Sequence, residues 1–244
     1  MAPLPPRNAF VAGASGAIGH VLCELLIEDG WTVVGTTRSP AKASELRSLG
    51  VQPVIVDVFD RSALIEAVCA ARPEVVVHQL TDLPKESDPE SLAAARPRNA
   101  RIREVGTSNL VAAAIEGKAR RLVAQSIAFA YAPGTKPYSE NAALDLTNAP
   151  AVGKLEGLVL GCGLEGVVLR YGRLYGPCTW SEIPSGGGPV HVDAAADAAR
   201  LAMTRGRPGI YNIAEEDGSV LSVKARKELG WNAAFRRPKP SVST

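Results

Sequence analysis

The chain lacks the features that mark several large classes of protein. It has only 4 cysteines among 244 residues, and they do not have the spacing of a metal site. Its 27 Lys and Arg nearly balance its 25 Asp and Glu, so a net charge of +2 creates no strong field for nucleic acid or an anionic membrane. It has no apolar run of about 18 residues that would span a membrane, and no apolar signal-peptide core near its start. We therefore expect a cytoplasmic protein without a metal, whose partner is a small molecule.

Cysteine use indicates packing rather than chemistry. Cys23 and Cys69 fall within apolar helical patterns, so we expect both to be buried free thiols. The densest basic run, arginines at 96, 98, 101 and 103, predicts a solvated helix face, and the alternative is a role in binding an acidic substrate.

Strand and helix signals alternate through the first 170 residues. Apolar runs typical of buried parallel strands stand at residues 9–12, 31–37, 54–57, 74–78, 121–126 and 166–170. Helical patterns lie between them, at residues 18–29, 40–49, 61–72, 99–117 and 150–160, whereas residues 81–97 predict a loop. This order predicts an α/β fold, a Rossmann-type doubly wound parallel sheet with right-handed crossovers.

The pattern changes after residue 176. Helices are predicted at residues 193–204 and 222–229, with a short strand at 210–213 between them. We expect a single domain with its core at residues 8–176, a reduced cap at 177–231, and a tail at 232–244 that is too polar to order itself.

A glycine-rich turn joins the first strand to the first helix. Residues 13–19 read Gly-Ala-Ser-Gly-Ala-Ile-Gly. The first glycine permits the tight turn, the second lets the backbone approach a pyrophosphate, and the third lets the helix lie against the strand. The helix N-terminus then offers free N–H groups to phosphate. We expect a dinucleotide to contact this loop through Gly13, Ser15, Gly16, Ala17, Ile18 and Gly19.

The end of the second strand predicts which dinucleotide is bound. NAD-binding sites usually place an acidic residue there, for the ribose 2′-hydroxyl, but residues 36–39 read Thr-Thr-Arg-Ser. Arg38 can pair with a 2′-phosphate and Ser39 can donate a hydroxyl to it, so we expect NADP(H). The alternative is that Arg38 is a solvated loop residue.

In sequence order, several further segments resemble the extended short-chain dehydrogenase/reductase superfamily, in its NAD-dependent epimerase/dehydratase branch. Together with residues 13–19, they are Asp57 after the third strand, then residues 105–110, 169–177, 190–193 and 224–231. The resemblance covers nearly the whole chain.

The resemblance also implies where the dinucleotide lies. It implies that Asp57 and Val58 lie beside the adenine, and that Gln79, Leu80 and Thr81 lie along the nicotinamide side. Tyr171 is implied to pass under the nicotinamide end. Helices at 99–117 and 150–162 match those that pair in the dimers of this family, so a homodimer is left open.

The chain departs from the family at its catalytic pair. The family's chemistry uses Tyr-x-x-x-Lys, in which the lysine lowers the pKa of the tyrosine and binds the ribose. Lys154 stands at the expected place, but the residue four positions earlier is Pro150, which exchanges no proton. We expect Lys154 to bind the nicotinamide ribose.

The proton donor is therefore open. Ser126 and Tyr131 are the candidate catalytic residues, but Ile127 occupies the position where the family usually has Ser or Thr, and Ser126 is one residue off. Asn99 or Asn109 could supply the polar group of the long helix, because Arg103 occupies the place where asparagine is usual.

Two functions remain open. The first is an NADP-dependent oxidoreductase or epimerase-like enzyme that acts on a small carbonyl or hydroxyl compound. The second is a non-catalytic NADP(H)-binding sensor or partner protein, which Pro150 and the small cap favour.

Overall fold

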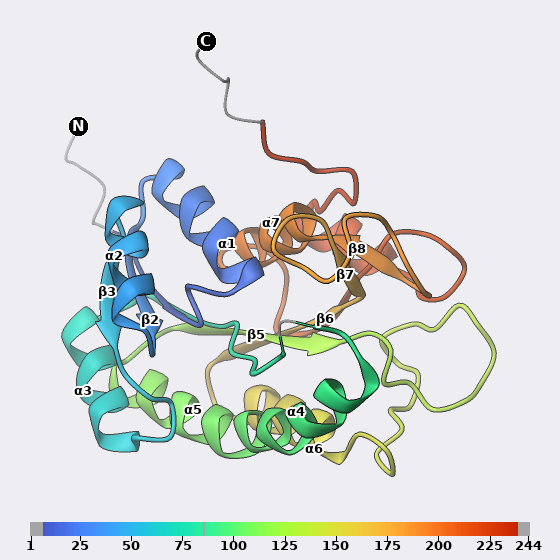
Figure 1. Ribbon diagram of the computed structural model, residues 1–244, viewed down its shortest axis with the longest axis horizontal. Helices are drawn as coiled ribbons and strands as arrows, with labels where there is room; N and C mark the ends of the chain where they lie inside the picture. The colour runs from blue at the N-terminus through green and yellow to red at the C-terminus, as the bar shows by residue number, and fades with distance from the viewer. Residues whose placement is uncertain (1–6, 85, 239–244) are drawn as a thin grey trace.

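A parallel sheet of seven strands forms the centre of the molecule (Figure 1). The structure is a computed structural model, and it describes residues 7–84 and 86–238. Along the sheet the order is β3-β2-β1-β4-β5-β6-β9. The bounds are β1 (Asn8–Ala12), β2 (Thr32–Thr37), β3 (Gln52–Ile55), β4 (Val75–His78), β5 (Arg121–Ile127), β6 (Glu165–Tyr171) and β9 (Gly209–Ile213). All neighbouring pairs are parallel, which confirms the predicted fold class.

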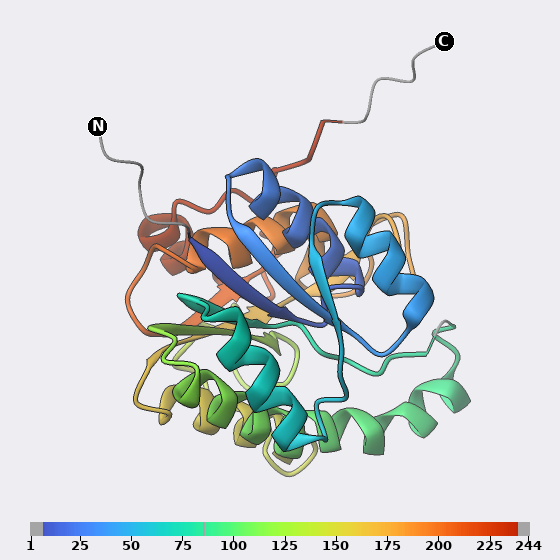
Figure 2. The ribbon, with the colours of Figure 1, turned by 90° about the vertical axis from the view of Figure 1, so that its left-hand side faces the viewer.

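Helices cover both faces of the sheet (Figures 1 and 2). On one face lie α1 (Ala17–Glu28), α2 (Pro40–Ser48) and α7 (Val192–Ala202). The opposite face carries α3 (Arg61–Ala71), α4 (Pro89–Arg101), α5 (Thr107–Glu116) and α6 (Pro150–Leu160). A π-helical turn, η1 (Ile102–Gly106), joins α4 to α5, and a second one, η2 (Ala225–Leu229), packs on α7. None of the described helices is long and apolar enough to cross a membrane.

The two layers follow from the alternation of side chains along each strand. On β1, Phe10 packs into the cluster under α3, α5 and α6, whereas Val11 packs into the cluster under α1 and α7. A strand buried on both faces needs apolar residues at every position, which is why the strand runs are continuous rather than alternating.

Three predicted elements differ from the structure. The predicted loop at 81–97 contains most of α4, because Asp88 caps its N-terminus by accepting a hydrogen bond from the Ser91 N–H and Pro89 suits the first helical turn. β3 begins and ends two residues before the predicted 54–57. The strand assigned to the cap is β9, which joins the main sheet beside β6.

A small separate sheet and a loop form what remains of the cap. β7 (Arg173–Tyr175) pairs in parallel with β8 (Pro189–His191), and the intervening residues 176–188 form a loop above the carboxyl edge. The His191 side chain caps α7 by accepting a hydrogen bond from the Asp193 N–H.

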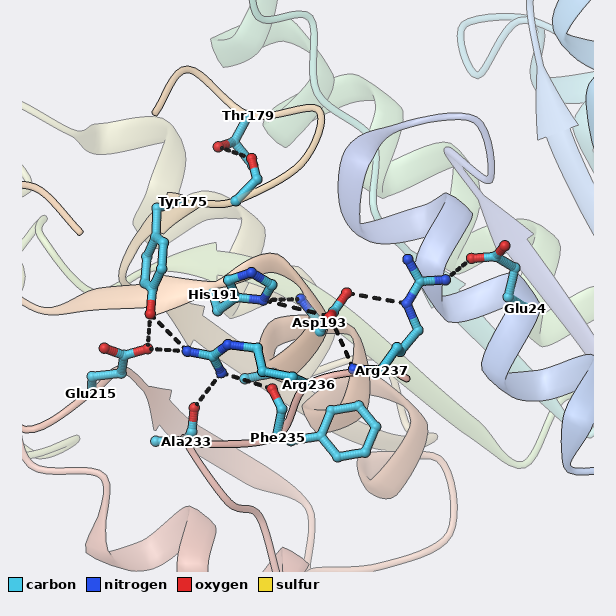
Figure 3. A network of polar contacts seen from close by, with 12 residues as sticks. Glu24, Tyr175, Thr179, His191, Asp193, Glu215, Ala233, Phe235, Arg236 and Arg237 are labelled. Atoms are coloured by element: carbon cyan, nitrogen blue, oxygen red, sulfur yellow. Dashed lines mark hydrogen bonds and ion pairs between the residues drawn. The ribbon is translucent and has the colours of Figure 1, made fainter. Parts of the chain in front are cut away.

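The prediction of a tail without order is wrong for residues 232–238. Phe235 packs against the core, and Arg237 bonds Asp193 and pairs with Glu24 of α1 (Figure 3). Arg236 donates to the Tyr175 hydroxyl at 2.7 Å. Ion pairs and hydrogen bonds of Arg236 and Arg237 therefore hold this segment, although its apolar content is low. The rest of the predicted tail, 239–244, lies outside the described residues.

Cysteine burial was predicted correctly at one of the two helical positions. Cys23 is buried and free, and its burial raises the pKa of its thiol to about 12. Cys69 is exposed, because it lies on the outer face of α3. Across the described residues, no group of three His, Cys, Asp or Glu side chains could hold a metal.

Candidate dinucleotide site

A cavity of about 240 Å³ lies at the carboxyl edge of the sheet, beside the glycine-rich turn. In a doubly wound fold, ligands bind at this edge, where the strand order reverses. Ten of the residues predicted to bind the cofactor line it: Gly13, Ser15, Gly16, Arg38, Ser39, Asp57, Val58, Gln79, Leu80 and Thr81. Ala17, Ile18, Gly19, Lys154 and Tyr171 are not among its lining residues.

The glycines of the turn have the geometry that the sequence required. Gly13 has φ 88°, and a Cβ there would lie 2.7 Å from the carbonyl carbon of Gln79. A Cβ at Gly19 would lie 2.1 Å from the Gly13 oxygen, so only glycine lets α1 lie so close to β1. Gly16 is the N-cap of α1 and provides no side-chain cap, which leaves N–H groups of the first turn available to an anion.

Two threonines of β2 hold the turn in place. Thr36 Oγ1 accepts a hydrogen bond from the Gly13 N–H at 3.1 Å. Thr37 Oγ1 accepts from the Ser15 hydroxyl and from the Ser39 N–H, each at 3.2 Å. The sequence analysis did not assign these threonines to the site, although a polar pair at the end of an otherwise apolar strand is a signal that could have found them.

A cluster of donors borders the cavity beyond β2. The Arg38 side chain is 61% exposed and its guanidinium lies 3.7 Å from the Asp82 carboxylate, which Arg98 also binds at 3.1 Å. Ser39 caps α2 by accepting from the Lys42 N–H, and Lys42 also lines the cavity. Sequence reasoning missed Lys42, whose place in the first turn of α2 follows directly from the Ser39-Pro40 helix start.

The opposite wall of the cavity is apolar. It consists of Val58, Phe59, Leu64 and Ile102. The Asp57 carboxylate accepts from the Phe59 N–H at 3.0 Å, and the Asn109 side chain donates to the Val58 carbonyl at 2.9 Å. These two hydrogen bonds hold the segment that carries Val58 and Phe59, beside which the adenine is predicted to lie.

Near the other end of the cavity, the segment after β4 is held by neighbouring strands. The Gln79 side chain donates to the Tyr171 hydroxyl at 3.2 Å, and the Gln125 side chain donates to the Leu80 carbonyl at 3.0 Å. Tyr171 is only 2% exposed, and burial raises the pKa of its hydroxyl. Tyr171 therefore supports Gln79 from behind, and its direct contact with a cofactor stays a prediction.

The two hydroxyl groups predicted to be catalytic belong to one buried polar network. Ser126 donates to the Glu156 carboxylate at 2.7 Å, and Glu156 pairs with Arg170 at 2.7 Å. The Tyr131 hydroxyl accepts from Arg170 at 2.9 Å and donates to Asn212 at 2.6 Å. Burial raises the pKa of Tyr131. The structure thus brings Ser126 and Tyr131 together through shared partners, and their catalytic role stays a prediction.

The α6 helix points different residues at the core and at solvent. Pro150 is its first residue, and Val152, Leu155 and Glu156 are buried. Lys154 lies on the exposed side. Its predicted contact with ribose stays a prediction.

Arg103 in η1 is a charged residue to which the sequence analysis gave no role in the site. It lies one turn after Asn99, which bonds both backbone groups of Asp82, and one turn before Thr107, which bonds His78. Arg103 is half-buried, and burial lowers the pKa of its guanidinium. Burial and the nearby charge of Arg103 lower the pKa of His78 to about 4. Among the described residues, the Arg103 side chain has no ion-pair or hydrogen-bond partner.

These features fit one class of ligand. The glycine turn and the uncapped helix N-terminus suit a pyrophosphate. The flanking cations suit a phosphorylated ribose, and the apolar wall suits an adenine. The residues present define a Rossmann-type dinucleotide-binding protein.

Comparison with known proteins identifies the family. Residues 9–185 match the model of the NAD dependent epimerase/dehydratase family. The 3-diazoavenalumate denitrifying reductase of a Streptomyces species is 40% identical over 240 aligned residues, which cover 86% of this chain and 76% of that protein. The chain belongs to the NAD-dependent epimerase/dehydratase family, which confirms the resemblance seen in the sequence.

Solved structures show the same fold. The UDP-glucose 4-epimerase of Thermotoga maritima, solved with UDP-glucose, superposes with a TM-score of 0.75 at 19% identity and covers 94% of both chains. The Bordetella bronchiseptica enzyme WbmH, solved with NAD⁺, gives a TM-score of 0.70 at 22% identity over 86% of this chain and 75% of that one. The protein is thus an NAD(P)-dependent enzyme of the oxidoreductase or epimerase/dehydratase kind, and its cofactor is a nicotinamide dinucleotide.

Proposed function

We propose that this protein is an NADP(H)-dependent reductase whose substrate accepts a hydride without a proton from an enzyme tyrosine. The observation that carries the proposal is the buried network around Glu156 and Arg170. It engages the hydroxyls of Ser126 and Tyr131 with protein partners, and Pro150 has no ionisable group. The nicotinamide, when bound, supplies the hydride, so this chain's residues need only bind and orient the two reactants.

An aryl diazonium ion meets this requirement. Addition of a hydride to such a cation breaks a carbon–nitrogen bond, releases N₂ and leaves a carbon–hydrogen bond. The two electrons come from the hydride and no proton is consumed. The Streptomyces relative, whose name describes the denitrifying reduction of a diazo compound, supports this substrate class. Reduction of the carbonyl compound expected from the sequence would also need a proton at oxygen, from solvent or Tyr131.

We also propose that the cofactor is NADP(H) rather than NAD(H). The site has Arg38, Ser39 and Lys42 at the end of β2 and the start of α2, and all three line the cavity. A carboxylate here would repel a 2′-phosphate, whereas a guanidinium, an ammonium and a helix N-terminus attract it. The pair between Arg38 and Asp82 is long and largely exposed, so Arg38 can turn to the phosphate at little cost.

The homodimer left open by the sequence is proposed for the α5 and α6 face. Val105, Ile115 and Leu160 are large apolar side chains that are exposed there. Val105 lies in η1, Ile115 in α5 and Leu160 in α6, all within the two helical segments that pair in dimers of the family, which supports a self-association surface. Light scattering on the purified protein, with and without Ile115→Glu, tests it.

A single-turnover experiment tests the reductase proposal. The protein is saturated with NADPH deuterated at nicotinamide C4 and mixed with a benzenediazonium ion in ordinary water. We expect N₂ release and a product with deuterium at the former diazonium carbon. We expect the rate of Tyr131→Phe to stay within about threefold of that of the unmodified protein. Loss of a general acid would typically lower the rate by 10²–10⁴-fold. Failure of a broad diazonium and carbonyl panel to take up deuterium would favour the non-catalytic alternative.

A further inference from the structure

An exposed aromatic ring and an arginine lie side by side at the carboxyl edge of the sheet. Phe129 follows β5 and is 48% exposed, and Arg173 begins β7, two residues after the end of β6. β5 and β6 are hydrogen-bonded neighbours with Ile127 opposite Tyr171, so both residues emerge at the same level. The guanidinium carbon of Arg173 lies 4.9 Å from the centroid of the Phe129 ring.

The loop above the sheet leaves room for the Arg173 side chain. Gly186 has φ 70°, and a Cβ there would lie 2.5 Å from Arg173 Cδ. The backbone of Arg173 is fixed as well, because its N–H donates to the Gly188 carbonyl at 2.9 Å. The side chain therefore lies between the Phe129 ring and the loop, which holds its charge in one place.

Arg173 differs from nearby arginines in having no acidic partner. Arg170 pairs with Glu156, and Arg236 pairs with Glu215. Within residues 7–84 and 86–238, no carboxylate lies at ion-pair distance from Arg173, and its side chain donates no hydrogen bond. A positioned, accessible guanidinium on an exposed ring, at the edge where this fold binds ligands, is suited to an anionic aromatic molecule.

We propose that Phe129 and Arg173 form the substrate subsite and select a planar aromatic compound that carries a carboxylate. This rests on the reductase function proposed above, for which it names the substrate class. A carboxylate can accept two parallel hydrogen bonds from a guanidinium, a geometry that an ammonium does not reproduce. The aromatic part of the substrate packs offset or edge-on against Phe129. The carboxylate end is then fixed, which directs the opposite, diazonium-bearing end along the carboxyl edge toward the nicotinamide side.

Calorimetric titration of the protein saturated with NADP⁺ tests the subsite without any turnover. The probes are cinnamate and its neutral amide, cinnamamide. A charge-assisted hydrogen bond corresponds to roughly 10- to 150-fold in affinity, so we expect cinnamate to bind at least about tenfold more tightly. Arg173→Gln should abolish this preference and Arg173→Lys should keep part of it. Phe129→Leu should weaken both probes.

The matched control is Arg47→Gln. Arg47 is also exposed, but it lies in the last turn of α2, away from the helix end that borders the cavity. It should leave the preference for cinnamate unchanged, and a thermal melt of each variant shows that the fold is retained. Equal binding of cinnamate and cinnamamide, or equal effects of the Arg173 and Arg47 variants, would overturn the subsite.

A second assay separates this proposal from the reductase function. Two benzenediazonium ions, one with a carboxylate and one with a carboxamide, are compared by the specificity constant for NADPH oxidation. Equal reduction of both supports the reductase and refutes the subsite. A cinnamate preference that depends on Arg173, without reduction of either diazonium ion, supports the subsite and refutes the reductase.

Discussion

The two halves of the cofactor site are built in different ways. Around the glycine turn, Thr36 and Thr37 hold the turn by accepting hydrogen bonds from Gly13 and Ser15, and the first turn of α1 has no side-chain cap, which leaves backbone N–H groups available beside the cavity. Around the far end of β5 and β6, the polar side chains instead bind one another: Ser126 to Glu156, and Tyr131 to Arg170 and Asn212. The first half is arranged to bind a ligand, and the second is arranged to hold the strands together.

This difference indicates that cofactor binding depends little on the side chains of α6. Binding of the pyrophosphate and adenine depends on backbone shape, which substitutions at α6 do not alter. The proton relay depends on single side chains, of which one is Pro150 here. A reaction that needs only an oriented hydride places no demand on those positions.

The largest effect is expected from breaking the buried pair of the far half. Glu156→Gln keeps an acceptor for Ser126 but leaves the Arg170 charge buried and unpaired, and such a change typically costs about 3–5 kcal/mol. The free energy of unfolding in urea measures it. Glu216→Gln is the control, because Glu216 pairs with Arg226 and both side chains are exposed, where about 0–1 kcal/mol is usual. Equal losses would contradict the structural role of the network.

The next largest effect concerns the preformed half. In Gly13→Ala, the new Cβ would meet the Gln79 backbone at 2.7 Å, so either the turn or the segment after β4 must move. We expect NADPH affinity to fall by about 100-fold, or about 2.7 kcal/mol. Gly30→Ala is the matched control: Gly30 also has positive φ, 78°, but its Cβ would meet nothing within 4 Å. Fluorescence titration should show near-normal affinity for that control.

The same contrast separates what the sequence predicts from what it does not. The glycine turn and Arg38 could be assigned because their spacing from a strand end fixes where they lie, and Asp57 was assigned from the family resemblance. The partners of Ser126 and Tyr131 could not be assigned, because Glu156 is 30 residues from Ser126 and Asn212 is 81 residues from Tyr131. α4 was missed because its prolines resemble loop punctuation, although Pro89 starts the helix and Pro97 is accommodated inside it.

A smaller effect is expected at the boundary of the adenine half. Arg38→Ala removes one of the cations near the predicted 2′-phosphate, and a charge-assisted hydrogen bond contributes roughly 1.5–3 kcal/mol. NADPH should lose about 10- to 150-fold in affinity, while NADH affinity stays nearly constant. Lys42→Ala should act in the same direction. Equal affinity of the unmodified protein for NADH and NADPH would refute the assignment of NADP(H).

Lys154 and Arg103 are the two candidate cations for a contact with the nicotinamide ribose. The sequence assigns this contact to Lys154, which is exposed, whereas half-buried Arg103 lies beneath the segment that Asn99 and Thr107 hold. We expect Arg103→Met to weaken NADPH binding about tenfold, close to the low end for a charge-assisted hydrogen bond. We expect Lys154→Met to change it less than about twofold. A larger loss of NADPH affinity in Lys154→Met than in Arg103→Met would favour Lys154 as the residue that binds the ribose.

The smallest effect is expected in the pH dependence of hydride transfer. Burial raises the pKa of Tyr131 and Tyr171 above the usual 10, so both stay protonated at neutral pH. The lowered pKa of His78, about 4, keeps that ring neutral. The single-turnover rate at saturating NADPH should therefore vary less than about twofold between about pH 6 and 9. A rate that instead changes tenfold per pH unit near neutrality would contradict a hydride transfer that needs no proton.

The free energy of unfolding responds differently to pH. Below the pKa of 6.5 in the unfolded chain, His78 binds a proton that the folded ring does not bind, so stability falls as pH drops toward 4.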